Sequence, residues 1–495
     1  MRSWAVKCGR WLLLGGMLLS SRSLLAQAAW EYSPYDVRLW VAAQPQVELP
    51  PAAIDSLSRD LAARGEAVFG SVWSVRASAA PASLRADLLA GANLTGERLK
   101  LSAPDLLAAD KLIVVSLAPS DLGWEVSARE MDLRTRLWSD ATRRDAANIE
   151  LLPHTAWDAA AACFTPLARI ERVEGPQVVA RLRAGGLIVD PASRAWIEPE
   201  MVLRPIIRRN DRAGEPLPKG GIQQVPWTLL SVRQRIDSLL TCELFSGYRA
   251  AIPSRGGVRT DRLALLVRPR YPATRLVLQS RAKPPQPLTG YEVHSREPSG
   301  TETQLIGVTD WRGSLEIPAG DNALRVFLVK NGNQLLARLP IVPGQAPQLD
   351  APLPDDDLRL QAEGAVTALY SRALDLVARR EILAARIRSR LKERKFDEAQ
   401  VLLDDFRQLE TRIDLGRALD TIQQAGRGGD KLTQARIDKL FAEARKVLLL
   451  KPLADDMVNT LAAELAKATA AATPAATPMP APATSAATPA PTAPR

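Results

Sequence analysis

Histidine and cysteine are scarce in this sequence, whose 495 residues include two histidines and three cysteines. So few imidazole and thiol groups argue against a structural zinc site and against a catalytic triad that depends on histidine. His154 follows Pro153, and His294 lies in an alternating strand pattern. Neither has a neighbour in the sequence that would orient its ring for proton transfer, so both are interpreted as incidental polar residues.

Motifs for nucleotide binding and nucleophilic catalysis are also missing. The chain has no Gly-x-Gly-x-x-Gly, Gly-x-x-x-x-Gly-Lys-Ser/Thr, Gly-x-Ser-x-Gly or His-Glu-x-x-His. Three consecutive acids at residues 355–357 could bind Ca²⁺ weakly. A charged linker at the start of a helix explains them better, because acids there suit the helix dipole. We therefore predict no catalytic residue, no cofactor and no metal.

The charge of the chain is only weakly biased. The formal net charge of +10 comes from 65 Lys and Arg against 55 Asp and Glu, and four of the positive residues lie in the first 28 residues, which hold no acid. Spread over so long a chain, this bias does not indicate nucleic-acid binding. A hydrophobic content of 46% with 24% charged residues is that of a globular protein with a sizeable core.

Residues 1–28 have the pattern of a secretory signal peptide. Arg2, Lys7 and Arg10 form a basic start, residues 11–19 form a short apolar run, and small residues end in Ala26-Gln27-Ala28. The apolar run is about half the roughly 20 residues that span a bilayer. No later stretch is long and apolar enough without charges. We predict an exported protein, periplasmic or extracellular, with no transmembrane anchor once the signal is removed.

Removal of that segment would leave two cysteines, Cys163 and Cys242. In an oxidising compartment the two thiols could form a disulfide that closes a long loop. They could equally be buried as small hydrophobic residues, and this is the favoured interpretation because a chain of this length needs no such cross-link.

Residues 35–168 alternate strand and helix signals, which predicts a two-layer α/β domain. The apolar run 111–117 predicts a central strand, and the alternation at 124–129 and 132–138 predicts a hairpin. Asp110-Lys-Leu-Ile-Val-Val115 and Asp132-Leu-Arg-Thr135 resemble strands of bacterial envelope domains, namely the TolB amino-terminal and CsgG-like domains. That resemblance implies protein binding or assembly without a catalytic constellation.

Residues 169–270 contain short strands separated by glycine-rich turns, which predicts a small β-barrel-like domain. Residues 271–347 follow with another series of alternating strands, including a hairpin at Asn331-Gly332. Pro287-Leu-Thr-Gly290 and the segment 307–313 (Gly-Val-Thr-Asp-Trp-Arg-Gly) resemble the carboxypeptidase regulatory-like family of seven-stranded β-sandwiches. That resemblance implies a fold and no active site, with Asp310 and Gly313 forming a tight turn.

Residues 356–468 carry helical patterns, with a helical hairpin around 392–396, Asp397 as a helix N-cap, and further helices at 432–448 and 453–468. Residues 469–495 are almost entirely Ala, Thr and Pro, which predicts a disordered tail. The complete expectation is a multidomain α+β protein with an α/β domain, a β-barrel-like domain, a β-sandwich, a helical region and a tail.

All eleven tryptophans lie at or before Trp311. Trp227, beside Pro226, and Trp311, in a turn, are the two candidates for an exposed binding aromatic. We predict a non-catalytic binding or scaffold protein of the bacterial cell envelope, whose partner is an envelope protein or a wall polymer. One alternative is a two-carboxylate hydrolase of cell-wall or extracellular polysaccharide, which needs a deep cleft with two acids about 5–9 Å apart. Another is a carbohydrate-binding module that uses Trp311.

Overall fold

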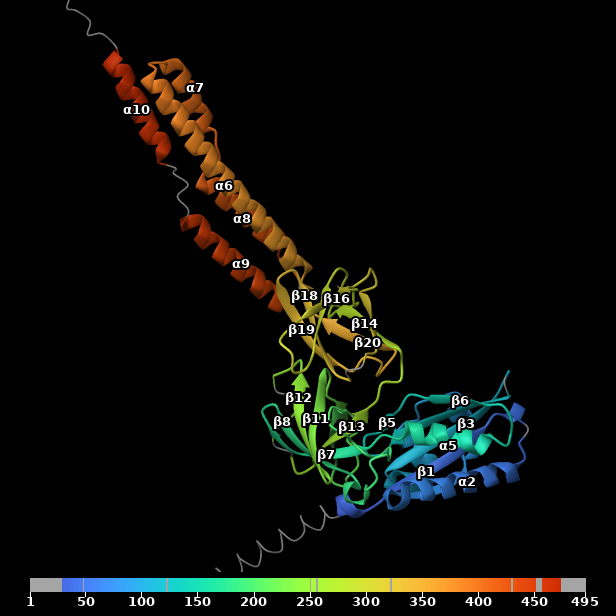
Figure 1. The fold of residues 1–495 in the computed structure, drawn as a ribbon. Helices are drawn as coiled ribbons and strands as arrows, with labels where there is room; N and C mark the ends of the chain where they lie inside the picture. Colours follow the sequence, from blue (N-terminus) through green and yellow to red (C-terminus); the bar gives the residue numbers. More distant parts are fainter. Residues whose placement is uncertain are drawn as a thin grey trace, which may run out of the picture. The chain divides into compact units, whose positions relative to one another are not determined.

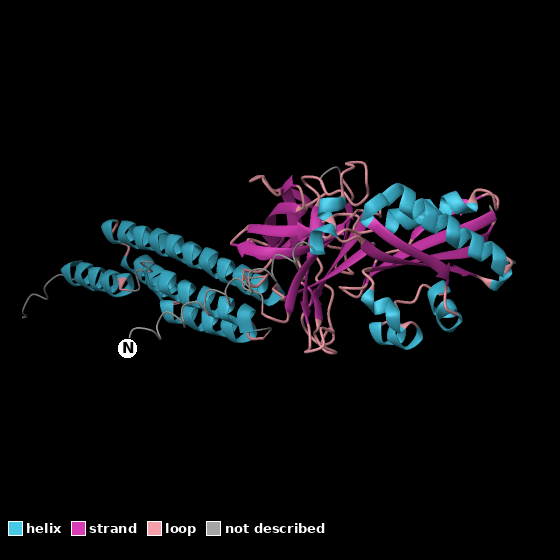
Figure 2. Cartoon of the chain, turned by 90° about the horizontal axis from the view of Figure 1, so that it is seen from below, coloured by secondary structure: helices cyan, strands magenta, loops and turns pink. Residues whose placement is uncertain are grey.

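The structure, a computed structural model, describes residues 29–47, 49–121, 123–249, 251–254, 257–320, 323–428, 431–450 and 456–472. The predicted signal peptide at 1–28 and the tail beyond Ala472 lie outside the described residues. The chain divides into two compact units, 1–353 and 354–495. As expected, the architecture is mixed α+β, with sheets in the first unit and helices in the described part of the second (Figures 1 and 2).

The first domain is a six-stranded sheet with helices on both faces, as Figure 2 shows. One face packs on α2 and α5, and the other packs on α3 and α4. The strand predicted to be central, β3, pairs with β1 on one side and with β4 on the other. The elements are β1 (Tyr35–Ala43), α2 (Pro51–Phe69), β2 (Trp73–Ala79), α3 (Ala82–Leu89), α4 (Gly96–Ser102), β3 (Lys111–Ser120), β4 (Gly123–Asp132), β5 (Leu137–Trp138), β6 (Thr142–Ala146) and α5 (Leu152–Cys163).

The hairpin predicted from 124–129 and 132–138 is present, but its turn lies later than predicted. A single strand, β4, continues to Asp132, and the chain turns only afterwards, so that β5 folds back on the end of β4. The side chain of Asp132 sets this turn, because its Oδ1 accepts a hydrogen bond from the backbone N–H of Thr135 at 2.7 Å.

The second domain is a closed six-stranded barrel, which confirms the barrel-like prediction. The ring runs β9-β11-β12-β8-β7-β13 and closes where β13 pairs with β9. Its interior belongs to the same hydrophobic cluster as one face of the first sheet, so the two domains share a core. The strands are β7 (Leu167–Glu174), β8 (Gln177–Leu182), β9 (Val202–Arg209), β10 (Ile222–Gln224), β11 (Thr228–Ile236), β12 (Leu239–Ser246) and β13 (Thr260–Val267).

The third domain is a sandwich of a three-stranded sheet, β17-β14-β20, and a four-stranded sheet, β16-β15-β18-β19. The predicted Asn331-Gly332 hairpin joins β18 and β19, with Gly332 at φ 58°. The last strand, β20, lies beyond the predicted limit at residue 347 and pairs in parallel with β14. The strands are β14 (Ala273–Ser280), β15 (Glu292–Arg296), β16 (Gln304–Val308), β17 (Ser314–Pro318), β18 (Arg325–Asn331), β19 (Gln334–Ile341) and β20 (Gln348–Leu353).

The second unit is built on one 36-residue helix, α6. Its first half packs on α8 and α9, and its second half packs on α7 and α10. Helix α7 begins at Phe396, so Asp397 lies in its first turn and is not the N-cap. Helix α10 continues to Ala472, past the predicted start of the tail at 469. The helices are α6 (Asp357–Lys392), α7 (Phe396–Arg407), α8 (Arg412–Ala425), α9 (Lys431–Leu450) and α10 (Met457–Ala472).

Candidate functional site

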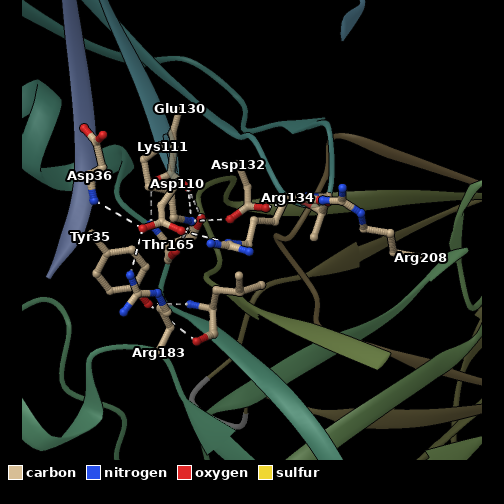
Figure 3. Close-up of polar contacts among 12 residues, drawn as sticks. Tyr35, Asp36, Asp110, Lys111, Glu130, Asp132, Arg134, Thr165, Arg183 and Arg208 are labelled. Carbon is tan, nitrogen blue, oxygen red and sulfur yellow. Dashed lines mark hydrogen bonds and ion pairs between the residues drawn. The ribbon is translucent and has the colours of Figure 1, made fainter. Parts of the chain in front are cut away.

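A buried cluster of charged side chains lies at the start of β3, close to the barrel (Figure 3). Lys111 and Asp132 are directly opposite each other on β3 and β4. Glu130 lies two residues before Asp132 and so points to the same face of the strand. The Lys111 Nζ is 2.8 Å from Oε1 of Glu130 and 2.8 Å from Oδ2 of Asp132, and it donates to the carbonyl of Thr165 at 2.6 Å. The three charged side chains are at most 1% exposed.

Asp110, the residue before Lys111, joins the α/β domain to the barrel. Its Oδ1 is 2.8 Å from Nε of Arg134, and its Oδ2 is 3.0 Å from Nη2 of Arg183, which follows β8 of the barrel. Arg183 also donates to backbone carbonyls of the segment before β1, including that of Pro34 at 2.9 Å. Each carboxylate oxygen of Asp110 thus has a guanidinium partner, one from each domain.

The two short segments that resemble envelope-domain strands meet in this cluster. The first supplies Asp110 and Lys111, and the second supplies Asp132 and Arg134. Sequence reasoning treated both segments as strand patterns and missed the ion pairs between them. The ion pairs could have been predicted, because charged residues at the ends of otherwise buried strands need partners.

Burial and pairing change the acidity of these groups in different directions. Burial alone would lower the pKa of Lys111, but the carboxylates of Asp132 and Glu130 outweigh it and raise that pKa. Burial raises the pKa of Glu130, and the Lys111 ammonium only partly opposes this. Burial would also raise the pKa of Asp110, but the guanidinium groups of Arg183 and Arg134 hold it below its usual value.

A cavity of about 120 Å³ borders this cluster, and its walls include Glu130 and Asp132. Arg204, Arg268 and Arg270 also line it. Two buried acids beside a cavity are a feature that a two-carboxylate hydrolase would show. However, both acids are held by one ammonium group, and the space is smaller than the roughly 300–1,000 Å³ usual for small-molecule sites. The cavity therefore does not fit a sugar polymer.

The two candidate binding tryptophans have different surroundings. Trp311 is 69% exposed, and the guanidinium of Arg312 lies 4.4 Å from its ring centre. Trp227 is half-buried, packs against the sandwich core and has φ 49°. Trp311 is therefore available to a partner, whereas Trp227 holds the barrel and the sandwich together.

Cys163 and Cys242 are free and buried, so the disulfide considered as the less favoured alternative is not formed in the structure. Cys163 ends α5, where its Sγ lies 3.2 Å from the carbonyl of Ala160, and Cys242 lies on β12. Both belong to the hydrophobic core that the first two domains share. Burial raises the pKa of Cys163, and it raises that of Cys242 to about 12, so both remain protonated thiols.

The remaining candidates form no assembled site. Asp356, from the acidic run, is fully buried and pairs with Arg359 at 2.6 Å and with Arg436 at 3.6 Å. His154 pairs with Asp158 on the exposed side of α5, and His294 pairs with Glu292. Within the described residues, no group of three or more His, Cys, Asp or Glu is placed to hold a metal ion. No described helix has the length and hydropathy needed to cross a membrane.

Comparisons with known proteins give only distant structural similarities. No family model and no curated protein matches the chain. Two solved structures are similar to parts of it: TolB from Acinetobacter baumannii, at 11% identity and TM-score 0.18, covers 64% of this chain and 96% of its own. The Bacillus anthracis TIE protein, at 9% identity and TM-score 0.13, covers 43% of this chain and 45% of its own. TM-scores this low carry no argument about fold or function.

Proposed function

We propose that this chain is an exported, non-catalytic binding or scaffold protein of the bacterial cell envelope. The proposal rests on the observation that the buried ionisable groups of the first domain are held in ion pairs. Lys111 is held between Glu130 and Asp132, and Asp110 is held between two arginines. Buried groups paired in this way stabilise the fold, whereas a general acid or base must reach a substrate.

The N-terminal sequence supports the location. A basic start, a short apolar run and Ala26-Gln27-Ala28 fit export through a cleaved signal peptide. The partner is an envelope protein or a wall polymer, and Trp311 is the exposed aromatic that would contact it. A narrower form of the proposal is that the sandwich binds carbohydrate through the exposed indole of Trp311.

The test is photo-crosslinking in the native envelope. A photoreactive amino acid at position 311 is expected to capture a specific envelope component. The same group at Val189, an 86% exposed position on the barrel domain, provides the matched control. Recovery of the chain in the cytoplasmic fraction, or equal capture from both positions, would contradict the proposal. A glycan array probed with the full chain and with Trp311→Ala separates carbohydrate from protein partners.

A polysaccharide hydrolase is the second candidate, because Glu130 and Asp132 border a cavity and burial raises the pKa of Glu130. The purified chain should be incubated with peptidoglycan and with soluble polysaccharides while reducing ends are measured. Turnover by the wild type that is lost in Glu130→Gln would replace the scaffold proposal with this one. We expect no turnover by either protein.

A further inference from the structure

Sheet edges offer unpaired backbone groups to other strands, and proteins usually guard them with charged residues or proline. Five of the longer edge strands of the three open sheets are guarded in this way. The guarding residues are Arg76 on β2, Arg143, Arg144 and Asp145 on β6, Glu316 and Pro318 on β17, Arg338 and Pro340 on β19, and Asp350 and Pro352 on β20. Besides β16, the remaining edge of these sheets is β5, which is two residues long, and β10 at the margin of the barrel sheet is three residues long.

Strand β16 lacks these guards. It reads Gln-Leu-Ile-Gly-Val, with no charge and no proline, and among the described strands it pairs only with β15. Leu305 on this strand is 51% exposed, Val308 is 49% exposed, and Trp311, three residues after Val308, is 69% exposed. Large apolar side chains therefore surround an open row of backbone donors and acceptors. Such a strand is ready to pair with another chain.

We infer that β16 pairs antiparallel with β16 of a second copy of this chain. A two-fold axis brings the same strand from both copies together, so each residue of the strand must tolerate its own counterpart. Like charges directly opposite each other destabilise a strand pair. The uncharged β16 avoids this, whereas self-pairing of β2, β6, β17, β19 or β20 would bring like charges close together.

The flanks of β16 carry complementary charges. Glu302 precedes the strand, and Asp310 and Arg312 follow it. The Asp310 carboxylate is held within the turn, where it accepts hydrogen bonds from the backbone N–H groups of Arg312 and Ser314. Glu302 and Arg312 are exposed, and neither forms an ion pair with any described residue of its own chain. In an antiparallel pair, the start of one strand lies near the end of the other. Glu302 of each copy therefore comes near Arg312 of the other, and the Leu305 and Val308 side chains lose exposure to water.

This inference goes beyond the proposed function and does not depend on the envelope partner. Sedimentation of the purified protein over a wide concentration range is expected to show a monomer–dimer equilibrium. Leu305→Lys puts a charge on the edge of each copy and is expected to raise the dimer Kd at least about tenfold. Val258→Lys is the matched control, because Val258 is fully exposed elsewhere and the same change there should leave the Kd unaltered.

Charge reversal tests the antiparallel arrangement. Glu302→Arg alone and Arg312→Glu alone each place like charges together and are expected to weaken the homodimer. A mixture of these two variants should associate more tightly than either variant alone, because position 302 of each copy then meets an opposite charge at position 312 of the other. A monomer at every concentration, or a dimer indifferent to Leu305→Lys, would overturn the inference. If β16 instead binds an extended segment of another protein, the purified chain stays monomeric. Envelope crosslinking would then be unaffected.

Discussion

Lys111 Nζ lies 2.8 Å from Oδ2 of Asp132, the residue directly opposite it on the neighbouring strand. Glu130 is equally close to the same ammonium group. One buried cation is thus shared by two buried acids at the edge of a core that the α/β domain shares with the barrel. Such a cluster is costly to break, because removing one member leaves uncompensated charge in a medium that solvates it poorly.

Lys111→Met is therefore expected to lower the free energy of unfolding by about 3–5 kcal/mol, because two carboxylates then remain buried without a cation. The measurement is chemical denaturation followed by circular dichroism. Lys100→Met, on the exposed side of α4, is the control and should change stability by no more than about 0.5 kcal/mol. Equal stability of the Lys111 variant and the wild type would show that the cluster is not closed to water.

Asp110 and Arg183 are expected to couple energetically across the two domains. In a double-mutant cycle with Asp110→Asn and Arg183→Gln, the interaction free energy should be about 0.5–3 kcal/mol, because their ion pair is almost fully buried. The exposed pair of Asp36 and Arg76 is the reference and should give less than about 1 kcal/mol. Additive effects at Asp110 and Arg183 would mean that the pair does not join the domains.

The pH dependence of stability is expected to contain two opposing contributions. The pKa of Asp110 lies below its ordinary 3.8, so its contribution is present above that pH and is lost as pH falls towards the folded-state pKa. The pKa of Glu130 lies above its ordinary 4.5, so its contribution is present below pH 4.5 and is lost as pH rises through the folded-state pKa.

Unfolding midpoints measured across acidic and neutral pH check both signs. Relative to the wild type, Asp110→Asn should lose less stability on acidification, and Glu130→Gln should lose less stability on raising the pH above 4.5. The same change of slope in both variants would contradict the assigned directions.

Cys163 and Cys242 are expected to be unreactive towards a thiol reagent in the folded protein and reactive after denaturation, because both are buried and protonated. A reductant should not shift the thermal unfolding midpoint, since no disulfide constrains the unfolded chain. Protein refolded under oxidising conditions serves as the comparison. A drop in the midpoint on reduction would show that the two cysteines pair after all.

The two tryptophans provide a matched pair of substitutions. Trp311→Ala should change stability by no more than about 0.5 kcal/mol, because the indole is exposed. Trp227→Ala should cost more than 1 kcal/mol, roughly, because that ring packs against the sandwich core. Denaturation curves of both variants show which substitution lowers the free energy of unfolding more. The reverse order would place Trp227 outside the packing between barrel and sandwich.

Much of the fold was predictable from local pattern. The apolar run of β3 indicated a central strand, short strands with glycine-rich turns indicated the barrel, and Asn331-Gly332 indicated the hairpin of β18 and β19. Two features of the fold were not predicted from local pattern: the position of the turn after β4 and the presence of strand β20. Asp132 delays the turn after β4, and no local feature marked β20, whose pairing with β14 joins residues far apart in the chain.

The features of the candidate site also separate into those set by local sequence and those set by tertiary packing. The sequence by itself determined which catalytic and nucleotide-binding motifs are missing. It also determined that the chain starts with a signal-like pattern and that Trp311 lies in a turn. These features depend only on residue type and on near neighbours in the chain. Only the tertiary structure decided that Lys111, Glu130 and Asp132 form one buried cluster and that Asp110 pairs with arginines of two domains. It also decided that Cys163 and Cys242 stay apart and that β16 is an edge strand without charge or proline. These relationships arise when distant segments pack together, and burial and pairing exist only in that folded arrangement.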